Sequence, residues 1–368
     1  MEIMYPDYDN CIVNLACSVL KHFGAVPPNP TLPLADKLLS RRCRNVVVML
    51  LDGMGLNIME KNLEADGFFR RNIAGTYSSV FPPTTVAATT ALDSGLYPVQ
   101  TAWLGWTGYF RDIDRNVEYF RNIDFDTEKP IEFMDAAQTY VPYRDICSVI
   151  SEETSADAYF LAPFREPYPE TFDDLCREVE RLCALPNEKY VYAYFHEPDS
   201  IMHRKGCFCD RSRNLLRDIE SRAEALAGSL SDTVFLITAD HGHINSPKAV
   251  ITDYPDIMEC LVRMPSIEPR CLNLFVKDGM SEQLERAFDE HFSGDFILIP
   301  KREVLERRLF GRGSPHPRLN DMLGDYLAAA VGDISIYNKK SKNFVANHAG
   351  ITRQEMEIAL IDASLAYK

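Results

Sequence analysis

Three aspartates of this sequence come at or just after the end of a short apolar run. They are Asp52 after residues 46–51, Asp199 after residues 190–195, and Asp240 after residues 233–239. Continuous apolar runs of this length are typical of strands that are buried on both faces of a parallel sheet. Such sheets bind ligands outside the carboxyl ends of their strands. We therefore expect the three carboxylates to converge on one crevice, where they would repel one another unless a cation lay between them.

Histidines accompany these aspartates. His241 is adjacent to Asp240, and His203 lies four residues after Asp199. Residues at this second spacing share one face of a helix and can chelate one ion. His348 follows a further short apolar stretch. A single aspartate after a strand is more commonly a helix cap or a turn residue, but four such coincidences at predicted strand ends are far less common.

The combined set contains six carboxylate and imidazole groups: Asp52, Asp199, His203, Asp240, His241 and His348. Mixed ligands of these two kinds suit Zn²⁺, Mn²⁺ or Fe²⁺ better than Ca²⁺. The set is too large for one tetrahedral ion and about right for two ions that share a nucleophile. The sequence therefore predicts two divalent metal ions, for which zinc, manganese and iron are all suitable.

A hydroxyl group that could serve as this nucleophile lies in residues 80–90, Val-Phe-Pro-Pro-Thr-Thr-Val-Ala-Ala-Thr-Thr. The two prolines force an extended approach, and the alanine-rich residues 86–92 favour a helix. Thr84 or Thr85 would then stand at the helix N-terminus, where free N–H groups and the helix dipole bind anions. Without metals, a plain threonine cap would be the simpler interpretation. Beside metals, a hydroxyl at this position is what covalent phosphoryl transfer requires.

The elements around these residues alternate between strands and helices. Apolar residues have helical spacing over residues 11–23, 172–185 and 211–230, and a last helix is expected from Thr352. This alternation predicts an α/β sandwich in which a central, mostly parallel sheet carries helices on both faces. We expect a single domain over residues 1–368, with an aromatic-rich cap insertion at 102–170 and a small α+β insertion at 271–310.

Length, composition and charge limit the classes of protein to which this chain can belong. The chain has 368 residues, of which 46% are hydrophobic and 25% charged, as is ordinary for a globular protein. The net charge of −15 argues against binding of a nucleic-acid polymer or a membrane surface, because both need a basic field. No signal peptide or membrane-spanning run is visible. We expect a cytoplasmic protein whose scattered cysteines are reduced and mostly buried, and the sequence makes no prediction of oligomeric state.

The order of the motifs along nearly the whole chain resembles the alkaline phosphatase superfamily, and within it the type I phosphodiesterase/nucleotide pyrophosphatase family. The matching segments are 51–55 (Leu-Asp-Gly-Met-Gly), 81–85 (Phe-Pro-Pro-Thr-Thr), 95–98 (Gly-Leu-Tyr-Pro), 197–203 (Glu-Pro-Asp-Ser-Ile-Met-His), 238–242 (Thr-Ala-Asp-His-Gly) and 348–352 (His-Ala-Gly-Ile-Thr). Asp-His-Gly alone is a weak signal, whereas the ordered set is highly specific.

The resemblance implies two zinc sites and a threonine nucleophile. One zinc site would consist of Asp199, His203 and His348, and the other of Asp52, Asp240 and His241. The nucleophilic threonine of the family lies four residues after the Phe of a Phe-Pro-x-x-Thr pattern. This position is Thr85 here, with Thr84 as the alternative.

Two departures from the family pattern concern the substrate. The nucleotide pyrophosphatases follow their nucleophile with Phe-Pro-Asn, whose Asn contacts the phosphate, but residues 86–88 here are Val-Ala-Ala. The His-Gly that is usual after Gly-Leu-x-Pro is replaced by Thr101 and Ala102. We therefore expect substrate handling to differ from that of the nucleotide pyrophosphatases. The cysteine or serine motif of sulfatases is missing, which argues against that branch.

Four further residues are weaker candidates. Trp106 and Tyr109 follow the nucleophile helix, and they would either stack on an aromatic group of the substrate or pack the insertion. Thr84 is a further candidate for substrate binding. His243 lies just past the Asp-His pair, and we expect it to orient a metal ligand, with contact to the substrate as the alternative.

The sequence thus predicts a metal-dependent hydrolase of small phosphoric esters that forms a covalent threonyl-phosphoryl intermediate. Diester or pyrophosphate cleavage is favoured over monoester cleavage on the resemblance alone. A phosphomonoesterase or a phosphonate hydrolase of the same superfamily stays open. So does an inactive metal-binding scaffold, although the intact ligands and threonine argue against it. A mutase would need a basic cap to retain its product, and no dense Lys/Arg cluster occurs between residues 102 and 169.

Overall fold

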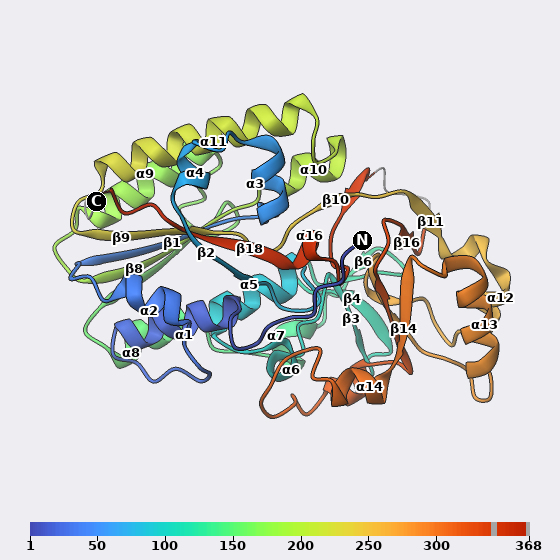
Figure 1. Cartoon of the computed structure of the whole chain (residues 1–368). Coiled ribbons are helices and arrows are strands. Elements are labelled where there is room, and N and C mark those ends of the chain that lie inside the picture. Colours follow the sequence, from blue (N-terminus) through green and yellow to red (C-terminus); the bar gives the residue numbers. More distant parts are fainter. Residues whose placement is uncertain (340–343, 366–368) are drawn as a thin grey trace.

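The computed structural model describes residues 1–339 and 344–365 and is centred on a six-stranded sheet (Figure 1). The strand order of this central sheet is β2-β18-β9-β1-β8-β7. Four neighbouring strands run parallel: β9 (Thr233–Thr238), β1 (Asn45–Leu51), β8 (Lys189–Phe195) and β7 (Asp157–Leu161). β18 (Glu357–Asp362) is antiparallel to β9 and to β2 (Ile73–Ser78). The predicted central, mostly parallel sheet is confirmed.

Helices cover both faces of the central sheet (Figure 1). One face carries α3 (Leu56–Asn62), α4 (Phe68–Arg71), α9 (Phe172–Cys183), α10 (Asp199–Lys205) and α11 (Asp210–Ser229). The other carries α1 (Ile12–His22), α2 (Pro33–Leu39), α5 (Thr85–Ser94) and α8 (Ile146–Glu153). Because β1, β8 and β9 lie between these layers, every residue in them is buried. This double cover explains why the three strands read as unbroken apolar runs.

A second sheet of eight antiparallel strands lies beside the first, in the order β14-β15-β13-β12-β3-β4-β5-β6. Its strands are β3 (Thr107–Phe110), β4 (Arg115–Glu118), β5 (Ile123–Asp124), β6 (Lys129–Pro130), β12 (Ser266–Glu268), β13 (Cys271–Leu274), β14 (Phe296–Pro300) and β15 (Tyr326–Ala330). The two segments that the sequence sets apart as insertions contribute strands to this one sheet, where β12 lies between β3 of the first segment and β13 of the second. Strand β7, near the end of segment 102–170, instead belongs to the central sheet.

The second sheet has helices of its own. They are α7 (Ala136–Tyr140), α12 (Pro255–Cys260), α13 (Ser281–Phe292), α14 (Lys301–Glu306) and α15 (Leu319–Met322). Helices α12 and α13 bury a separate apolar cluster against β13, β14 and β15, with Leu284, Phe288 and Phe296 among its members. The antiparallel sheet therefore has its own core on the side away from the central sheet.

Short elements connect the two sheets. They are α6 (Pro98–Thr101), β10 (Ile244–Asn245), β11 (Lys248–Val250), a 3-10 turn η1 (Ile251–Asp253), β16 (Ser335–Tyr337), β17 (Ala346–Asn347) and α16 (Arg353–Met356). The helix expected from Thr352 is only the four-residue α16, and β18 follows it directly. The reason is tertiary, since residues 358–361 are buried between β2 and β9, where a strand satisfies their backbone groups.

A buried ion pair joins the two sheets. Arg270, between β12 and β13, and Glu355 of α16 have no exposed side-chain surface. The Nε of Arg270 donates to Oε1 of Glu355 at 2.6 Å, and its Nη2 donates to Oε2 at 2.9 Å. The guanidinium also donates to the carbonyl oxygens of Gly332 and Ile334, and Glu355 accepts from the backbone N–H of Gly350. This network fixes the loop that carries His348.

Two further expectations can be compared with the fold. Within residues 1–339 and 344–365, no helix is both apolar enough and long enough to cross a membrane. The ten cysteines are all unpaired, and seven of them are buried.

Candidate active site

The loops that follow β1, β8 and β9 bring the three predicted aspartates together. Because β1 lies between β8 and β9, the carboxyl ends of the three strands meet at one edge of the sheet. The backbone N–H of Asp199 donates to the carbonyl oxygen of Asp52 at 3.0 Å. The backbone N–H of Gly53 donates to Oδ1 of Asp240 at 2.9 Å. These bonds hold the loops in register and direct the carboxylates into one crevice.

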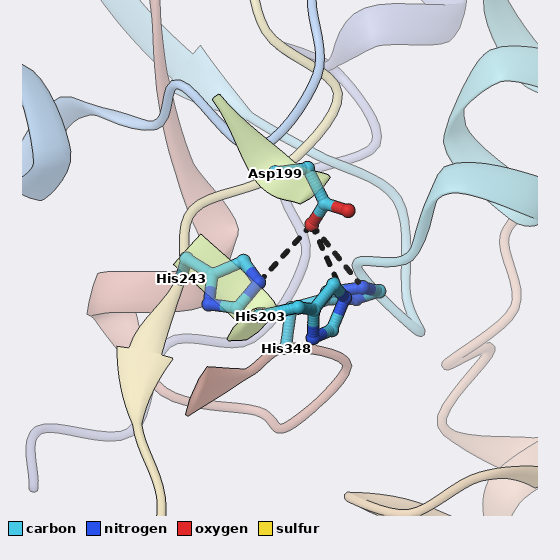
Figure 2. A group of neighbouring side chains, drawn as sticks. All are labelled: Asp199, His203, His243 and His348. Carbon is cyan, nitrogen blue, oxygen red and sulfur yellow. Dashed lines mark ion pairs between the residues drawn. The ribbon is translucent and has the colours of Figure 1, made fainter. Parts of the chain in front are cut away.

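The first cluster, here called the Asp199 group, contains Asp199, His203, His243 and His348 (Figure 2). Oδ1 of Asp199 lies 3.0 Å from Nε2 of His243, 3.4 Å from Nε2 of His203 and 3.8 Å from Nε2 of His348. Asp199 and His203 are one turn apart on α10, as their spacing predicts. The other two histidines come from the loops after β9 and β17. Segments far apart in the sequence therefore supply one set of possible ligand atoms.

The second cluster, here called the Asp52 group, contains Asp52, Asp240 and His241. Nε2 of His241 lies 3.4 Å from Oδ1 of Asp52 and 3.4 Å from Oδ2 of Asp240. Tyr194, at the end of β8, donates its hydroxyl proton to Oδ2 of Asp52. The two clusters adjoin, since one ligand atom each of Asp52, Asp199 and His241 lie within 4.8 Å of one another.

Backbone carbonyl groups orient three of the histidines. The Nδ1 atoms of His203, His241 and His348 lie 2.8, 2.9 and 3.2 Å from the carbonyl oxygens of Ala346, Gly242 and Pro83, respectively. A carbonyl oxygen can only accept a hydrogen bond, so each Nδ1 carries the proton. Each Nε2 then presents its lone pair to the clusters, which is the tautomer that a metal ligand needs.

Thr85 is the first residue of α5, and its side chain faces the Asp52 group. Its Oγ1 lies 3.3 and 3.4 Å from the two carboxylate oxygens of Asp52 and 3.2 Å from Nε2 of His241. Thr84 occupies the N-cap position with an extended backbone, but its hydroxyl does not cap the helix. It donates instead to Oε1 of Glu268 at 2.6 Å. The two adjacent hydroxyls thus point to different parts of the molecule.

The charges of the two clusters have opposite effects on their aspartates. Burial and the nearby carboxylates of Asp240 and Asp199 raise the pKa of Asp52 well above its usual value. Burial also raises the pKa of Asp240, although His241 opposes this effect. For Asp199, burial favours the neutral form, but His203 and the other imidazoles outweigh it and hold the pKa well below its usual value. Burial lowers the pKa of His203 to about 4, so its ring is neutral near pH 7.

Unsatisfied polar atoms show that the clusters suit a cation. Oδ1 of Asp199, Oδ2 of Asp240 and Nε2 of His243 are buried, and none has a hydrogen-bond partner among the described residues. A buried polar atom without a partner costs about 1–3 kcal/mol. Divalent ions in the two clusters would satisfy all three atoms and would offset the repulsion between the carboxylates. The residues present therefore fit the divalent metals that the sequence predicts.

A comparison with protein families bears on this geometry. Residues 46–267, which include Asp52, Thr85, Asp199 and Asp240, match the family model described as type I phosphodiesterase / nucleotide pyrophosphatase. The chain belongs to this family. Membership places it among phosphoric-ester hydrolases that carry a metal site. No match was found among curated protein sequences.

Solved structures agree with the family assignment at the level of the fold. Murine ectonucleotide pyrophosphatase / phosphodiesterase 5, as an inactive variant in complex with AMP, has a TM-score of 0.64 at 16% identity; the alignment covers 86% of this chain and 87% of that one. The human protein of the same name has a TM-score of 0.65 at 14% identity, with the same shares of both chains covered. These similarities show the alkaline-phosphatase-like fold.

In this family member, a cavity of about 720 Å³ opens beside the two clusters. Its lining includes Thr85 and His348 from the clusters, and Trp106 and Glu268 from the segments around the antiparallel sheet. Both sheets therefore enclose the space next to Thr85. Glu268 was not found from the sequence, because no local motif marks it as part of the site.

Trp106 lines the cavity as proposed from the sequence, but two other candidates do not. Thr84 is only 1% exposed. The hydroxyl of Tyr109 donates to Asp114, and its ring packs against Phe275 with 4.9 Å between the ring centroids. The substrate roles suggested for Thr84 and Tyr109 are therefore not supported by their positions.

Proposed function

We propose that the protein is a two-metal phosphoric-ester hydrolase in which Thr85 is the nucleophile. The observation that carries this proposal is the position of Oγ1 of Thr85, 3.2–3.4 Å from atoms of Asp52 and His241, at the N-terminus of α5. A hydroxyl in this place can approach a phosphorus atom that is bound between the two clusters. Free N–H groups of the first turn of α5 would favour the negative phosphoryl oxygens.

The metal ligands follow from the two clusters. Asp52, Asp240 and His241 would hold one divalent ion, and Asp199, His203 and His348 the other, with zinc favoured over manganese or iron. When bound, two such ions polarise the phosphoryl oxygens and stabilise both the attacking and the leaving oxygen.

The residues of the chain then account for two displacement steps. The hydroxyl of Thr85, which donates toward the carboxylate of Asp52 at 3.3 Å, loses its proton as it attacks. A bond forms between Oγ1 and phosphorus, the bond from phosphorus to the leaving-group oxygen breaks, and the leaving-group oxygen takes up a proton in exchange for the one that Thr85 has lost. In the second step a water molecule attacks the threonyl-phosphoryl group. This restores the hydroxyl of Thr85 and releases the remaining phosphate monoester.

The cavity supports a small ester with an organic group on the phosphate. Its volume of about 720 Å³ lies in the range of pockets that bind small molecules. The aromatic face of Trp106 offers a surface for an apolar or aromatic group. We favour diesters or pyrophosphates because the family model carries these names. A nucleotide ester is a reasonable first probe, since the murine relative was solved in complex with AMP.

A side-by-side assay tests this proposal. Protein freed of metal by a chelator and reloaded with Zn²⁺ or Mn²⁺ would be given bis-p-nitrophenyl phosphate, p-nitrophenyl phosphate and a nucleotide phenyl ester. We expect turnover of the diesters only after metal is restored. Faster cleavage of p-nitrophenyl phosphate would identify a phosphomonoesterase instead. No turnover by protein that holds two metal ions would favour the inactive scaffold.

The covalent intermediate needs a separate measurement. Mass spectrometry of protein quenched in acid during turnover should find a phosphoryl group on the peptide that contains Thr85. Absence of this adduct in the presteady state, with normal turnover, would favour direct attack by water over attack by the threonine.

A further inference from the structure

His243 occupies a position that the two three-residue metal sites do not explain. Its side chain is fully buried. Among the three histidines of the Asp199 group, its Nε2 lies nearest to Oδ1 of Asp199, at 3.0 Å against 3.4 Å for His203 and 3.8 Å for His348. In Figure 2 its ring lies to the left of the same carboxylate oxygen, whereas the other two rings lie to the right of it.

The approach of His243 to Asp199 differs from that of a residue that only orients a ligand. An orienting histidine would donate its Nε2–H to the carboxylate. At 3.0 Å the two atoms are close enough for a hydrogen bond, yet Nε2 of His243 and Oδ1 of Asp199 both have no hydrogen-bond partner among the described residues. The contact therefore does not have the geometry of a hydrogen bond. Both atoms are instead free to face a shared third partner.

The arrangement of the four ligand atoms matches a single ion. One atom from each member of the Asp199 group lies within 4.8 Å of all the others. Around a tetrahedral zinc ion with bonds of about 2.0–2.2 Å, neighbouring ligand atoms are roughly 3.3–3.6 Å apart. The distances from Asp199, 3.0 to 3.8 Å, bracket this range.

The planes of the three imidazole rings are also steeply inclined to one another rather than stacked. The ring of His243 makes angles of 78° with that of His203 and 65° with that of His348, and the latter two rings are inclined at 58° to each other. Sγ of Cys207 lies 3.6 Å from Nδ1 of His243 and can accept the proton of that atom. Nε2 is then left with a free lone pair.

We infer that His243 is a fourth protein ligand of the divalent ion at the Asp199 group, which would then be held by three imidazoles and one carboxylate. This inference rests on the proposed function, since it presumes that the clusters bind metal. It makes the two metal sites unequal. Four protein ligands fill a tetrahedral site, so a substrate oxygen would bind this ion only as a fifth ligand, whereas three ligands leave a position for substrate. The Asp199 group should therefore hold its ion more tightly than the Asp52 group.

Nuclear magnetic resonance of the Co²⁺-loaded wild-type protein tests the ligand count directly. Each histidine that binds Co²⁺ through Nε2 keeps one exchangeable Nδ1–H proton, whose resonance the paramagnetic ion shifts strongly. Ligation by His203, His241, His243 and His348 predicts four such resonances. Three resonances with two bound ions would overturn the inference and leave the proposed function intact. A protein that binds no Co²⁺ would instead contradict the proposed function itself.

Two substitutions separate ligation from orientation. His243→Asn and His243→Gln remove the imidazole, but both amides can still donate a hydrogen bond to Asp199. We expect both to weaken the tighter ion by more than the 10–100-fold that loss of an orienting hydrogen bond costs, as measured by competition with a chelator. His291→Asn is the matched control, because His291 pairs with Asp256 in the second sheet's helices and should leave both ions unchanged. Wild-type affinity in either His243 variant would show that the residue only orients Asp199.

Discussion

The Asp52 group and the Asp199 group lie side by side at the same edge of one sheet, but their charges are balanced differently. The Asp52 group sets two carboxylates against one imidazole, and its aspartates have raised pKa values because they are buried and lie near further carboxylates. The Asp199 group sets one carboxylate against three imidazoles, which outweigh burial and lower the pKa of Asp199.

This difference separates the two tasks of the site. The uncompensated negative charge of the Asp52 group lies beside Oγ1 of Thr85. This is where a cation is most needed to offset the charge, and where the nucleophile must be activated. The imidazole-rich group carries the charge of one carboxylate and offers the lone pairs of three imidazoles close together, which suits tight retention of an ion. Both groups lie where they do because the carboxyl ends of parallel strands meet at one edge of the sheet. They differ because one contains more carboxylates and the other more imidazoles.

Removal of ligands from the Asp52 group should have the largest effect. Asp240→Asn combined with His241→Ala deletes two of three ligands beside Thr85, so turnover should be abolished while the fold is largely kept. Elemental analysis after zinc loading should then find one ion per chain instead of two. His203→Asn is the counterpart in the Asp199 group. Loss of both ions in the Asp52-group variant would show that the groups bind metal only together.

Thr85→Ala should lower kcat by several orders of magnitude, because it removes the covalent route and leaves only attack by water. Metal content should be unchanged, since Thr85 belongs to neither set of ligands. Thr85→Ser, which keeps a hydroxyl at the start of α5, should retain part of the activity. Substantial activity of the alanine variant would remove the functional distinction between the two groups.

Arg270→Met should destabilise the protein by about 3–5 kcal/mol, because it leaves the carboxylate of Glu355 buried and unpaired. Urea unfolding measures this loss. The double variant Arg270→Met with Glu355→Gln removes both charges and should recover most of it. Glu355 holds the N–H of Gly350 near His348, so metal at the Asp199 group should weaken more than metal at the Asp52 group. Equal weakening at both would contradict the local role of this ion pair.

The pH dependence of stability should report the buried imidazoles of the Asp199 group. In metal-free protein the pKa of His203 is lowered from 6.5 to about 4 by burial. Between these two pH values the unfolded chain binds a proton at His203 and the folded protein does not. The contribution of His203 to the free energy of unfolding is therefore complete above about pH 6.5 and falls as the pH drops toward 4. Relative to His203→Asn, the free energy of unfolding of the wild type should decrease over this window. If the difference in free energy of unfolding between the wild type and His203→Asn did not change with pH, His203 would be more solvated than the structure shows.

Thr84→Val should have the smallest effect. It removes the hydroxyl that donates to Glu268 and should cost about 1.5 kcal/mol of stability, as expected for one hydrogen bond to a charged group. Because Thr84 faces the antiparallel sheet, most of the activity should remain. An inactive Thr84→Val beside an active Thr85→Ala would move the nucleophile by one residue.

The sequence predicted the part of the site that depends on strand ends. Asp52, Asp199 and Asp240 follow buried apolar runs, and the parallel order of β8, β1 and β9 brings them together as expected. The one-turn spacing of Asp199 and His203 also holds, since both lie on α10. These features are local, because a run of apolar residues and the polar residue after it identify a strand and its end without knowledge of the rest of the fold.

Other features required the tertiary structure. Glu268 contacts Thr84 across 184 residues, and the pairing of β12 with β3 that brings it there leaves no mark in either segment alone. The stretch expected to continue as a helix after Thr352 becomes β18, because strands β2 and β9 on either side of it pair with its backbone N–H and C=O groups.

The sequence by itself determined which chemical groups stand at the ends of the strands, and that one of two adjacent threonines begins a helix. The resemblance already favoured Thr85 as the nucleophile, but only the tertiary structure decided that Thr84 turns to Glu268, that Tyr109 donates to Asp114, and that Nε2 of His243 lies beside Asp199. The physical reason is that a residue's type and its element follow from nearby residues. The direction in which its side chain points at a shared site depends on packing between segments that are distant in the chain.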